Sequence, residues 1–280
     1  MTQEPRAFII GWPVAHSRSP LIHRHWLDEL GIKGSYEAVA LPPDELEGFL
    51  STLGEQGFVG GNVTLPHKEK AFALCAETTP TAARLEAVNT LWMEAGKLHG
   101  DNTDVIGFLA ALDEDVPGWG KVLEKVVVLG AGGAGRGIVH GLMLRGAERI
   151  LVINRTRARS EELRLRFGAT IALGDLADLP AALAGADLLV NTTSLGMAGQ
   201  APLDIDLAPL PDHAVVSDIV YVPLETELLR RARRRGLRTS AGLGMLLHQA
   251  VPGFERWFGR RPEVTPELRA RVAADIEERP

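Results

Sequence analysis

The sequence predicts an α/β protein with two α/β domains, and three observations lead to this fold class. Short strand-like runs alternate with helix-like segments along residues 6–110, the pattern expected of βαβ units. A second alternation of the same kind begins at Lys125. Between the two, residues 113–121 (DEDVPGWGK) are rich in charge and in residues that break helices. We therefore expect one domain over residues 1–112 and another over residues 113–241, with helices of residues 242–280 packing back on the first.

In the first domain, β-branched and aromatic residues gather in short runs, and segments of helical periodicity lie between them. The predicted strands are residues 7–11, 35–41, 62–65 and 90–93, and the predicted helices are residues 20–30, 44–53 and 68–77. Pro66 is expected at the start of the third helix, where proline presets the backbone angle. Lys68 then falls in the first turn, where the helix dipole disfavours a cation. This unfavourable position makes Lys68 a candidate for chemistry.

In the second domain, the apolar run VVVL (126–129) leads into a glycine-rich turn, a helix ending near Arg145, and the run ILVINRT. Another helix, the strand-like runs DLLVNTTS and AVVSDIVY, and a basic helix follow. After Gly242, one continuous helix is expected with Leu246, Leu247, Ala250 and Val251 on its apolar side. A further helical segment reaches the carboxyl terminus.

Composition excludes several classes of protein. The 280 residues are 45% hydrophobic and 24% charged, as in folded soluble proteins. The formal net charge of -6 argues against non-specific attraction to nucleic acid. The amino terminus lacks a basic leader, and no segment approaches the roughly 18 apolar residues of a membrane span, so we expect no membrane association. The single cysteine, Cys75, cannot form an internal disulfide, which fits a cytoplasmic location.

The turn after VVVL has the spacing of a dinucleotide-binding loop. Gly130, Gly132 and Gly135 follow the pattern G-x-G-x-x-G between a buried strand and a helix. Such glycines let the backbone approach a pyrophosphate, whose charge is met by the amino terminus of the helix. The alternative is a glycine-rich turn that only closes a strand–helix junction. The surrounding βαβ unit favours dinucleotide binding and therefore a Rossmann domain.

The end of the next strand indicates which dinucleotide binds. A carboxylate there would hydrogen-bond the ribose of NAD, but this chain has Asn154, Arg155, Thr156, Arg157 and Arg159. Guanidinium groups can hold a phosphate through paired hydrogen bonds, which favours NADP. The alternative is a solvated basic turn in which Thr156 caps the following helix.

Polar clusters in the first domain complete a larger pattern. Each cluster alone has a simple explanation, since Ser19 could cap the helix from Pro20, and Thr103 or Asp104 could cap a helix near Val105. Together with the second domain they form nine motifs in order: S-x-S-P (17–20), N-V-T-L-P-x-K (62–68), A-V-N-T (87–90), G-D-N-T-D (100–104), G-A-G-G-A (130–134), N-R-T (154–156), N-T-T-S-x-G-M (191–197), D-x-x-Y-x-P (218–223) and G-x-G-M-L-x-x-Q-A (242–250). This set resembles the shikimate dehydrogenase family through nearly the whole chain. Arg18 departs from the lysine usual in the first motif.

The resemblance implies an NADP-dependent oxidoreductase of aromatic amino acid and chorismate biosynthesis, which reversibly reduces 3-dehydroshikimate to shikimate. It implies an N-terminal substrate-binding domain, completed by the carboxy-terminal helices, and an NADP-binding Rossmann domain, with a cleft between them. By matching position, Lys68 is the catalytic acid/base and Asp104 its partner. Reduction of a ketone needs a proton at oxygen, which an ammonium can donate. The helix terminus and desolvation lower the pKa of Lys68 while Asp104 raises it, and sequence does not rank these contributions.

The remaining roles also follow from the resemblance. The implied substrate-binding residues are Ser17, Ser19, Thr64, Asn89, Asp104, Tyr221 and Gln249. The implied cofactor-binding residues are Gly130, Ala131, Gly132, Gly133, Ala134, Asn154, Arg155, Thr156, Arg159, Ile219 and Gly242. No metal site is expected, because the spacing of histidine, cysteine and aspartate does not resemble a zinc site. We expect a small-molecule substrate and a monomer or homodimer.

Two alternatives stay open. One is a quinate/shikimate dehydrogenase that uses NAD, which an acidic residue after the second Rossmann strand would favour. The other is a non-catalytic Rossmann protein that senses NADPH, which would not need the polar set of the first domain.

Overall fold

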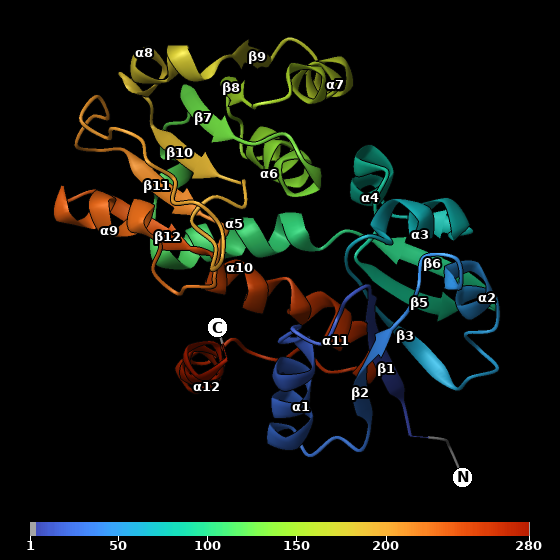
Figure 1. Ribbon diagram of the computed structural model, residues 1–280. Coiled ribbons are helices and arrows are strands. Elements are labelled where there is room, and N and C mark those ends of the chain that lie inside the picture. Colours follow the sequence, from blue (N-terminus) through green and yellow to red (C-terminus); the bar gives the residue numbers. More distant parts are fainter. Residues whose placement is uncertain (1–3, 280) are drawn as a thin grey trace. The chain divides into compact units, whose positions relative to one another are not determined.

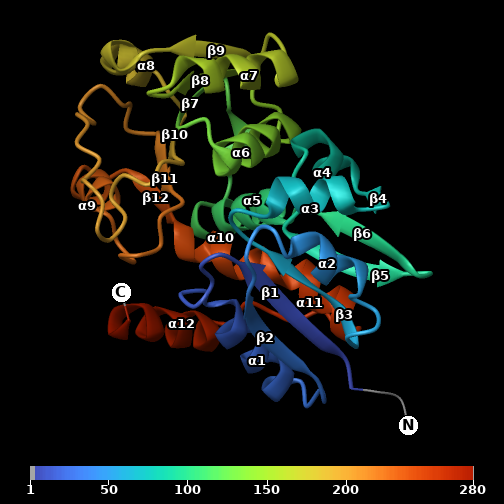
Figure 2. The same ribbon diagram turned by 45° about the vertical axis from the view of Figure 1, so that its right-hand side comes forward.

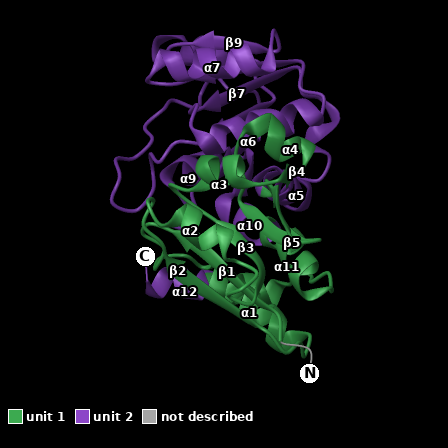
Figure 3. Cartoon of the chain, turned by 90° about the vertical axis from the view of Figure 1, so that its right-hand side faces the viewer, with its two compact units in different colours: residues 1–103, 249–272 green, residues 104–248, 273–280 purple. Residues whose placement is uncertain are grey.

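The computed structural model describes residues 4–279, and the chain divides into two compact units. Unit 1 comprises the described residues up to Thr103 together with Gln249–Val272, and unit 2 comprises Asp104–His248 with the residues from Ala273 on (Figure 3). The chain passes from unit 1 to unit 2 after Thr103, before the expected boundary at residue 112. It returns to unit 1 after His248, later than the expected boundary at residue 242. The reason is that α5 (Asp104–Asp115) packs against α6 (Gly133–Leu144) and α10 (Gly242–His248), so both flanking helices belong to unit 2.

Unit 1 is built on a six-stranded mixed sheet in the order β2-β1-β3-β5-β6-β4 (Figures 1 and 2). The strands are β1 (Arg6–Gly11), β2 (Ser35–Ala40), β3 (Phe58–Val63), β4 (Glu77–Thr78), β5 (Thr90–Glu94) and β6 (Lys97–Asp101). β1 pairs in parallel with β2 and β3, whereas β5 is antiparallel to both β3 and β6. The carboxyl ends of β1 and β3 therefore meet at one edge of the sheet, where two of the predicted polar motifs begin.

Helices cover both faces of this sheet (Figure 2). They are α1 (Ser19–Glu29), α2 (Leu46–Ser51), α3 (Lys68–Leu74), α4 (Pro80–Leu85) and α11 (Ala250–Phe258). The last helix, α12 (Pro266–Glu278), begins in unit 1 and ends in unit 2. Phe8 and Ile10 on one face of β1 pack in a core with residues of α2 and α3. On the other face, Trp257 of α11 donates its indole N–H to the carbonyl oxygen of Leu91 at 2.8 Å. α11 thus packs on the sheet of unit 1.

A buried histidine lies beside the aromatic side chains of α11, on the same face of the sheet. His23 of α1 is fully buried and stacks on Tyr36 with ring centroids 4.0 Å apart. Neither of its ring nitrogens has a hydrogen-bond partner among the described residues. Burial lowers the pKa of His23 to about 3, against a smaller opposing contribution from Asn62.

We expect this histidine to make unfolding pH-dependent. Its folded pKa lies below the ordinary 6.5, so the unfolded chain binds the extra proton and stability is lost as pH falls from about 6.5 toward 3. The loss approaches about 1.4 kcal/mol per pH unit inside that window. Denaturant unfolding at several pH values should show that the free energy of unfolding changes less steeply with pH for His23→Leu than for the parent. His16→Leu, at an exposed position, should keep the parental slope. Equal slopes for all three proteins would contradict this prediction.

Unit 2 is a six-stranded parallel sheet in the order β12-β11-β10-β7-β8-β9 (Figure 1). The strands are β7 (Lys125–Leu129), β8 (Arg149–Ile153), β9 (Ile171–Gly174), β10 (Leu188–Asn191), β11 (Val215–Asp218) and β12 (Arg238–Ala241). The other helices of the unit are η1 (Trp119–Lys121), α7 (Arg157–Phe167), η2 (Leu176–Asp178), α8 (Leu179–Leu183) and α9 (Glu227–Arg234). Chain order reverses between β7 and β10, and ligands of such sheets bind at the carboxyl ends of the strands at that reversal.

Some predicted elements differ in extent or were missed. The predicted strand 62–65 is shifted, since β3 ends at Val63 and includes the glycine pair that weakened its pattern. The single helix expected after Gly242 is two helices, α10 and α11, separated at Gln249. The sequence did not predict β4, β6, β9, β12, α4 or α8, which are at most six residues long. Such short elements depend on their neighbours more than on local pattern.

Within residues 4–279, no helix is long and apolar enough to cross a membrane.

Candidate active site

Lys68 is the first residue of α3, with His67 at the N-cap position. Pro66 was predicted at the first helical position, and this prediction is wrong. It lies in the turn before the helix. The His67 N–H donates to the carbonyl oxygen of Thr64 at 3.0 Å and closes that turn. The His67 ring nitrogen Nε2 lies 2.8 Å from the carbonyl oxygen of Leu41. These contacts hold the start of α3, so that partly buried Lys68 follows the short turn 64–67 after β3.

The serine motif follows β1 at the same edge of the sheet. Ser19 is the first residue of α1 and does not cap it, because the N-cap position is Arg18 and no side-chain capping bond is present. The backbone N–H of Ser19 donates to Ser17 Oγ at 3.2 Å, which places the two serines together. The buried Ser19 hydroxyl also interacts with the Tyr36 hydroxyl. The capping interpretation of Ser19 was wrong.

Asn89 and Gln249 are 160 positions apart in the chain and meet in unit 1. Asn89 Nδ2 donates to Gln249 Oε1 at 3.5 Å, the outer limit of a hydrogen bond. Thr103 links the two residues, because its backbone N–H donates to Asn89 Oδ1 at 2.8 Å and its hydroxyl donates to the Gln249 carbonyl oxygen at 2.8 Å. The structure thus brings together two of the predicted substrate-binding residues through one that sequence reasoning had considered only as a cap.

Asp104 directly follows Thr103 and is the first residue of α5 in unit 2. Lys68 belongs to unit 1. Thr64 lies one residue beyond β3, partly buried, and its backbone N–H donates to the Ile10 carbonyl oxygen at 2.9 Å. The three residues occupy ends of strands or starts of helices, where side chains can reach a ligand at the edge of a sheet.

In unit 2, the glycine loop joins β7 to α6 at the reversal of strand order. Gly130 has a φ of +105°, and a Cβ there would lie 2.5 Å from Thr192 Oγ1, so this position needs glycine for the fold itself. Gly132 and Gly133 differ, because a Cβ at either position would meet no atom within 4 Å. The open space beside them is what a bound pyrophosphate requires.

Asn154 connects the glycine loop to the basic turn after β8. Its Oδ1 accepts a hydrogen bond from the Ala131 N–H at 3.2 Å, and its Nδ2 donates to the Thr156 carbonyl oxygen at 2.8 Å. The side chain therefore joins the stretch predicted to bind the pyrophosphate to the stretch predicted to bind the 2′-phosphate. Its structural role is to fix their separation.

The arginines of the basic turn fall into two groups. Arg157 pairs with Glu161 at 3.2 Å and lies 3.6 Å from Asp175. Arg155 and Arg159 are exposed, and neither guanidinium has a hydrogen bond or ion pair within residues 4–279. Thr156 occupies the N-cap position of α7 without a side-chain capping bond, so the capping interpretation was wrong there also. This turn thus carries two exposed guanidinium groups beside a helix terminus that has no side-chain cap.

The loops after β10 and β11 are held by two buried residues that had no assigned role, Asn191 and Asp218. Asp218 accepts hydrogen bonds from Asn191 Nδ2 at 2.9 Å, Thr226 Oγ1 at 2.7 Å and the Val220 N–H at 3.1 Å. Burial raises the pKa of Asp218, and these three hydrogen bonds oppose that rise. Asn191 and Asp218 each begin one of the nine motifs, and this position was the only indication in the sequence that they have a role.

Two implied cofactor-binding residues, Ile219 and Gly242, lie beside each other in this part of unit 2. A Cβ at Gly242 would lie 2.2 Å from the Ile219 carbonyl oxygen, so glycine allows α10 to start directly against the segment after β11. Tyr221 lies two residues further on, partly buried, in the same segment.

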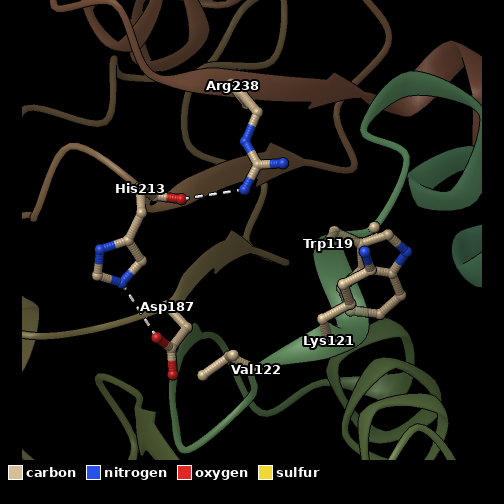
Figure 4. Close-up of a pocket in the computed structure, with 7 residues that line it drawn as sticks. Trp119, Lys121, Val122, Asp187, His213 and Arg238 are labelled. Carbon is tan, nitrogen blue, oxygen red and sulfur yellow. Dashed lines mark hydrogen bonds and ion pairs between the residues drawn. The ribbon is translucent and has the colours of Figure 1, made fainter.

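A surface pocket of about 380 Å³ lies at the opposite edge of the unit 2 sheet (Figure 4). Its polar side chains come from the amino ends of the strands, where His213 Nε2 lies 3.2 Å from Asp187 and Arg238 donates to the His213 carbonyl oxygen at 3.2 Å. The glycine loop follows the carboxyl end of β7, so this pocket is separate from the candidate site. Among residues 4–279, no three histidine, cysteine, aspartate or glutamate side chains gather as a metal site would require.

Unit 2 has the strand order, glycine loop and basic turn of a Rossmann fold, and the class defined by the two units is a dinucleotide-dependent oxidoreductase. Three family models match the chain: the shikimate dehydrogenase substrate binding domain over residues 9–91, shikimate / quinate 5-dehydrogenase over residues 120–197, and the shikimate 5'-dehydrogenase C-terminal domain over residues 242–266. The chain belongs to the shikimate dehydrogenase family.

Individual relatives agree with this assignment. The shikimate dehydrogenase (NADP(+)) of Methylocella silvestris is 63% identical over 98% of this chain and 97% of its own length. The shikimate 5-dehydrogenase of Thermus thermophilus, solved with NADP(H) and shikimate, has a TM-score of 0.83 and 37% identity over 97% of this chain and 99% of that chain. The quinate dehydrogenase of Corynebacterium glutamicum, solved with NAD, has a TM-score of 0.89 and 30% identity with the same coverage.

Proposed function

We propose that this protein catalyses the reversible, NADPH-dependent reduction of 3-dehydroshikimate to shikimate. The observation that carries this function is the 63% identity, over nearly the full length of both chains, to a relative named shikimate dehydrogenase (NADP(+)). The basic turn with Arg155 and Arg159 supports the same cofactor. Oxidation of quinate with NAD is not favoured, because no carboxylate stands at residues 154–159.

The residues of unit 2 fit NADP. We propose that residues 130–134 hold the pyrophosphate, that Arg155 and Arg159 hold the 2′-phosphate with Asn154 and Thr156 beside them, and that Ile219 and Gly242 adjoin the nicotinamide. The space beside Gly132 supports this placement, as do the Arg155 and Arg159 guanidinium groups, neither of which has a partner within residues 4–279. When bound, NADPH supplies a hydride to the substrate carbon.

Within the first unit, we propose that Lys68 donates a proton to the ketone oxygen as the hydride arrives, and that it accepts this proton in the reverse direction. General acid catalysis of this kind contributes about a hundredfold to ten-thousandfold to the rate. Asp104 is the proposed partner of Lys68, by its matching position in the family's motif.

The other polar residues would orient the substrate. We propose that Ser17, Ser19 and Tyr221 bind its carboxylate and that Thr64, Asn89, Asp104 and Gln249 bind its ring hydroxyls. A site built of paired polar groups rejects an analogue that leaves one of them unpaired. We propose further that the enzyme acts in the cytoplasm as a monomer or homodimer and that it binds neither nucleic acid nor membranes.

One assay tests the function against its alternatives. Purified protein should raise absorbance at the NADPH band with shikimate and NADP, and it should respond far less to quinate or to NAD. Activity confined to quinate and NAD would overturn the proposal in favour of the sister activity. Tight NADPH binding without turnover of either substrate would indicate a sensor.

The glycine loop provides a prediction about the cofactor. Gly132→Ala should fold normally, because its φ of -82° suits alanine and the added methyl group meets no protein atom. The methyl group should instead crowd the pyrophosphate, at a cost of about 1–3 kcal/mol, which corresponds to a tenfold to hundredfold higher Kd for NADP. Fluorescence titration with NADPH measures this change. Gly48→Ala, on exposed α2 with equally open surroundings, is the matched control. Parental affinity in Gly132→Ala would contradict the placement of the pyrophosphate.

A further inference from the structure

Four buried polar residues of unit 1 have no role in the proposed function, yet they form one hydrogen-bonded network. Tyr36, Asn62, Thr90 and Thr103 are each at most 4% exposed. The network reaches the proposed substrate-binding residues at both ends, with Ser19 beside Tyr36 and with Asn89 and Gln249 beside the two threonines. Buried polar groups of this kind are costly unless they are fully paired, and here their pairing has a direction.

The direction begins at Tyr36. Its hydroxyl donates to Asn62 Oδ1 at 2.6 Å, and burial raises the pKa of the phenol well above its usual value, so it keeps the proton that it donates. Because Oδ1 is the acceptor, Asn62 Nδ2 faces the other way. It donates one proton to the Asn89 carbonyl oxygen at 3.0 Å and the other to Thr90 Oγ1 at 3.3 Å.

The direction continues through Thr90 to Asn89. Having accepted from Asn62, the Thr90 hydroxyl donates its own proton to Asn89 Oδ1 at 2.9 Å. The same oxygen accepts the backbone N–H of Thr103 at 2.8 Å, and a backbone N–H can act only as a donor. The Thr103 hydroxyl also lies 3.1 Å from this oxygen. Donors of Thr90 and Thr103 therefore point at one end of the Asn89 amide and identify that end as oxygen.

The opposite end of the amide is then a donor. Asn89 Nδ2 is turned toward Gln249 Oε1 at 3.5 Å, a distance that leaves room for a stronger acceptor. Thr103 also holds Gln249, since its hydroxyl donates to the carbonyl oxygen of that residue at 2.8 Å. The two threonines thus hold two of the four proposed ligands of the ring hydroxyls, Asn89 and Gln249.

We propose that Thr90 and Thr103 are positioning residues for substrate recognition: their donors orient the Asn89 amide so that it presents Nδ2 to a substrate hydroxyl oxygen. This inference rests on the proposed function, in which Asn89 and Gln249 bind the ring hydroxyls. A rotated amide would place Nδ2 against two donors, so the network excludes the orientation that would offer an oxygen to the substrate.

Thr90 is the testable member, because its contribution comes from the side chain alone. Thr90→Val keeps the shape of the residue and removes the hydroxyl. We expect the KM for shikimate to rise about tenfold, the effect of one lost hydrogen bond on uniform binding, with kcat and the KM for NADP nearly unchanged. Thr90→Ser restores the donor and should recover most of the affinity. Thr79→Val, which removes a hydroxyl that caps α4, controls for loss of stability alone and should keep the parental KM.

A double-mutant cycle decides whether Thr90 acts through Asn89. In the Asn89→Ala background, Thr90→Val should have no further effect on the KM for shikimate, because the amide that it orients is gone. Additive effects, a parental KM in Thr90→Val, or equal impairment in Thr90→Ser would each overturn the inference while leaving the proposed function intact. If the parental protein itself fails to oxidise shikimate while it binds NADPH, the proposed function is wrong and the inference falls with it.

Discussion

Lys68→Ala should lower kcat for shikimate oxidation by about a thousandfold, within the range that general acid–base catalysis contributes. Lysine occupies the first position of α3, where an ammonium is disfavoured by the helix dipole, and the proposed proton transfer would explain its presence there. Without this side chain, the substrate oxygen must exchange its proton with water. Steady-state kinetics in both directions measures the loss.

The same variant should leave cofactor affinity unchanged, because the proposed NADP-binding residues all belong to unit 2 and Lys68 belongs to unit 1. Lys70→Ala is the matched control: it is a lysine of the same helix, is exposed, and donates to the carbonyl oxygen of Pro43 at 3.1 Å. It should retain parental turnover. A kcat for Lys68→Ala within a few-fold of the parent would remove Lys68 from the chemistry.

Replacing both Arg155 and Arg159 with alanine should raise the Kd for NADP by about a hundredfold or more. Each guanidinium has no partner within residues 4–279 and would form charge-assisted hydrogen bonds to the 2′-phosphate, worth about 1.5–3 kcal/mol apiece. The Kd for NAD, which lacks that phosphate, should change little. Titration of the double variant with both cofactors measures the difference.

Arg157→Ala is the internal control for this experiment. Arg157 lies between the other two arginines in sequence, yet its guanidinium pairs with Glu161 and lies near Asp175, so its loss should not affect the preference for NADP. If the double variant lost affinity for NADP and NAD equally, the arginines would be supporting the loop rather than binding the phosphate.

The fold alone does not distinguish the two activities of this family. The quinate dehydrogenase solved with NAD has a higher TM-score, 0.89, than the shikimate dehydrogenase solved with NADP(H), 0.83. Both cofactors bind at the same reversal of strand order in Rossmann sheets. The choice between them depends on side chains after β8, and in this chain those side chains are cationic or neutral.

The sequence by itself determined the longer elements and the cofactor fingerprint, because both are encoded locally. VVVL is apolar in every position of a fully buried strand, and β7 is that strand. The G-x-G-x-x-G spacing predicted a strand–turn–helix, which the structure confirms. The order of nine motifs indicated the family. Local pattern was insufficient for Pro66, for β3 and for the break between α10 and α11, where neighbouring segments decide where an element starts or ends.

Only the tertiary structure decided which polar groups have partners. Arg157 can pair locally with Glu161, four residues further along α7, but only the tertiary structure brings Asp175 to 3.6 Å from its guanidinium. The Asn89 amide accepts from the Thr103 N–H and faces Gln249 Oε1, which is 160 positions away in the chain. The physical reason is that backbone propensity acts over a few residues, whereas hydrogen bonds form between groups that folding brings within about 3 Å, whatever their separation in sequence.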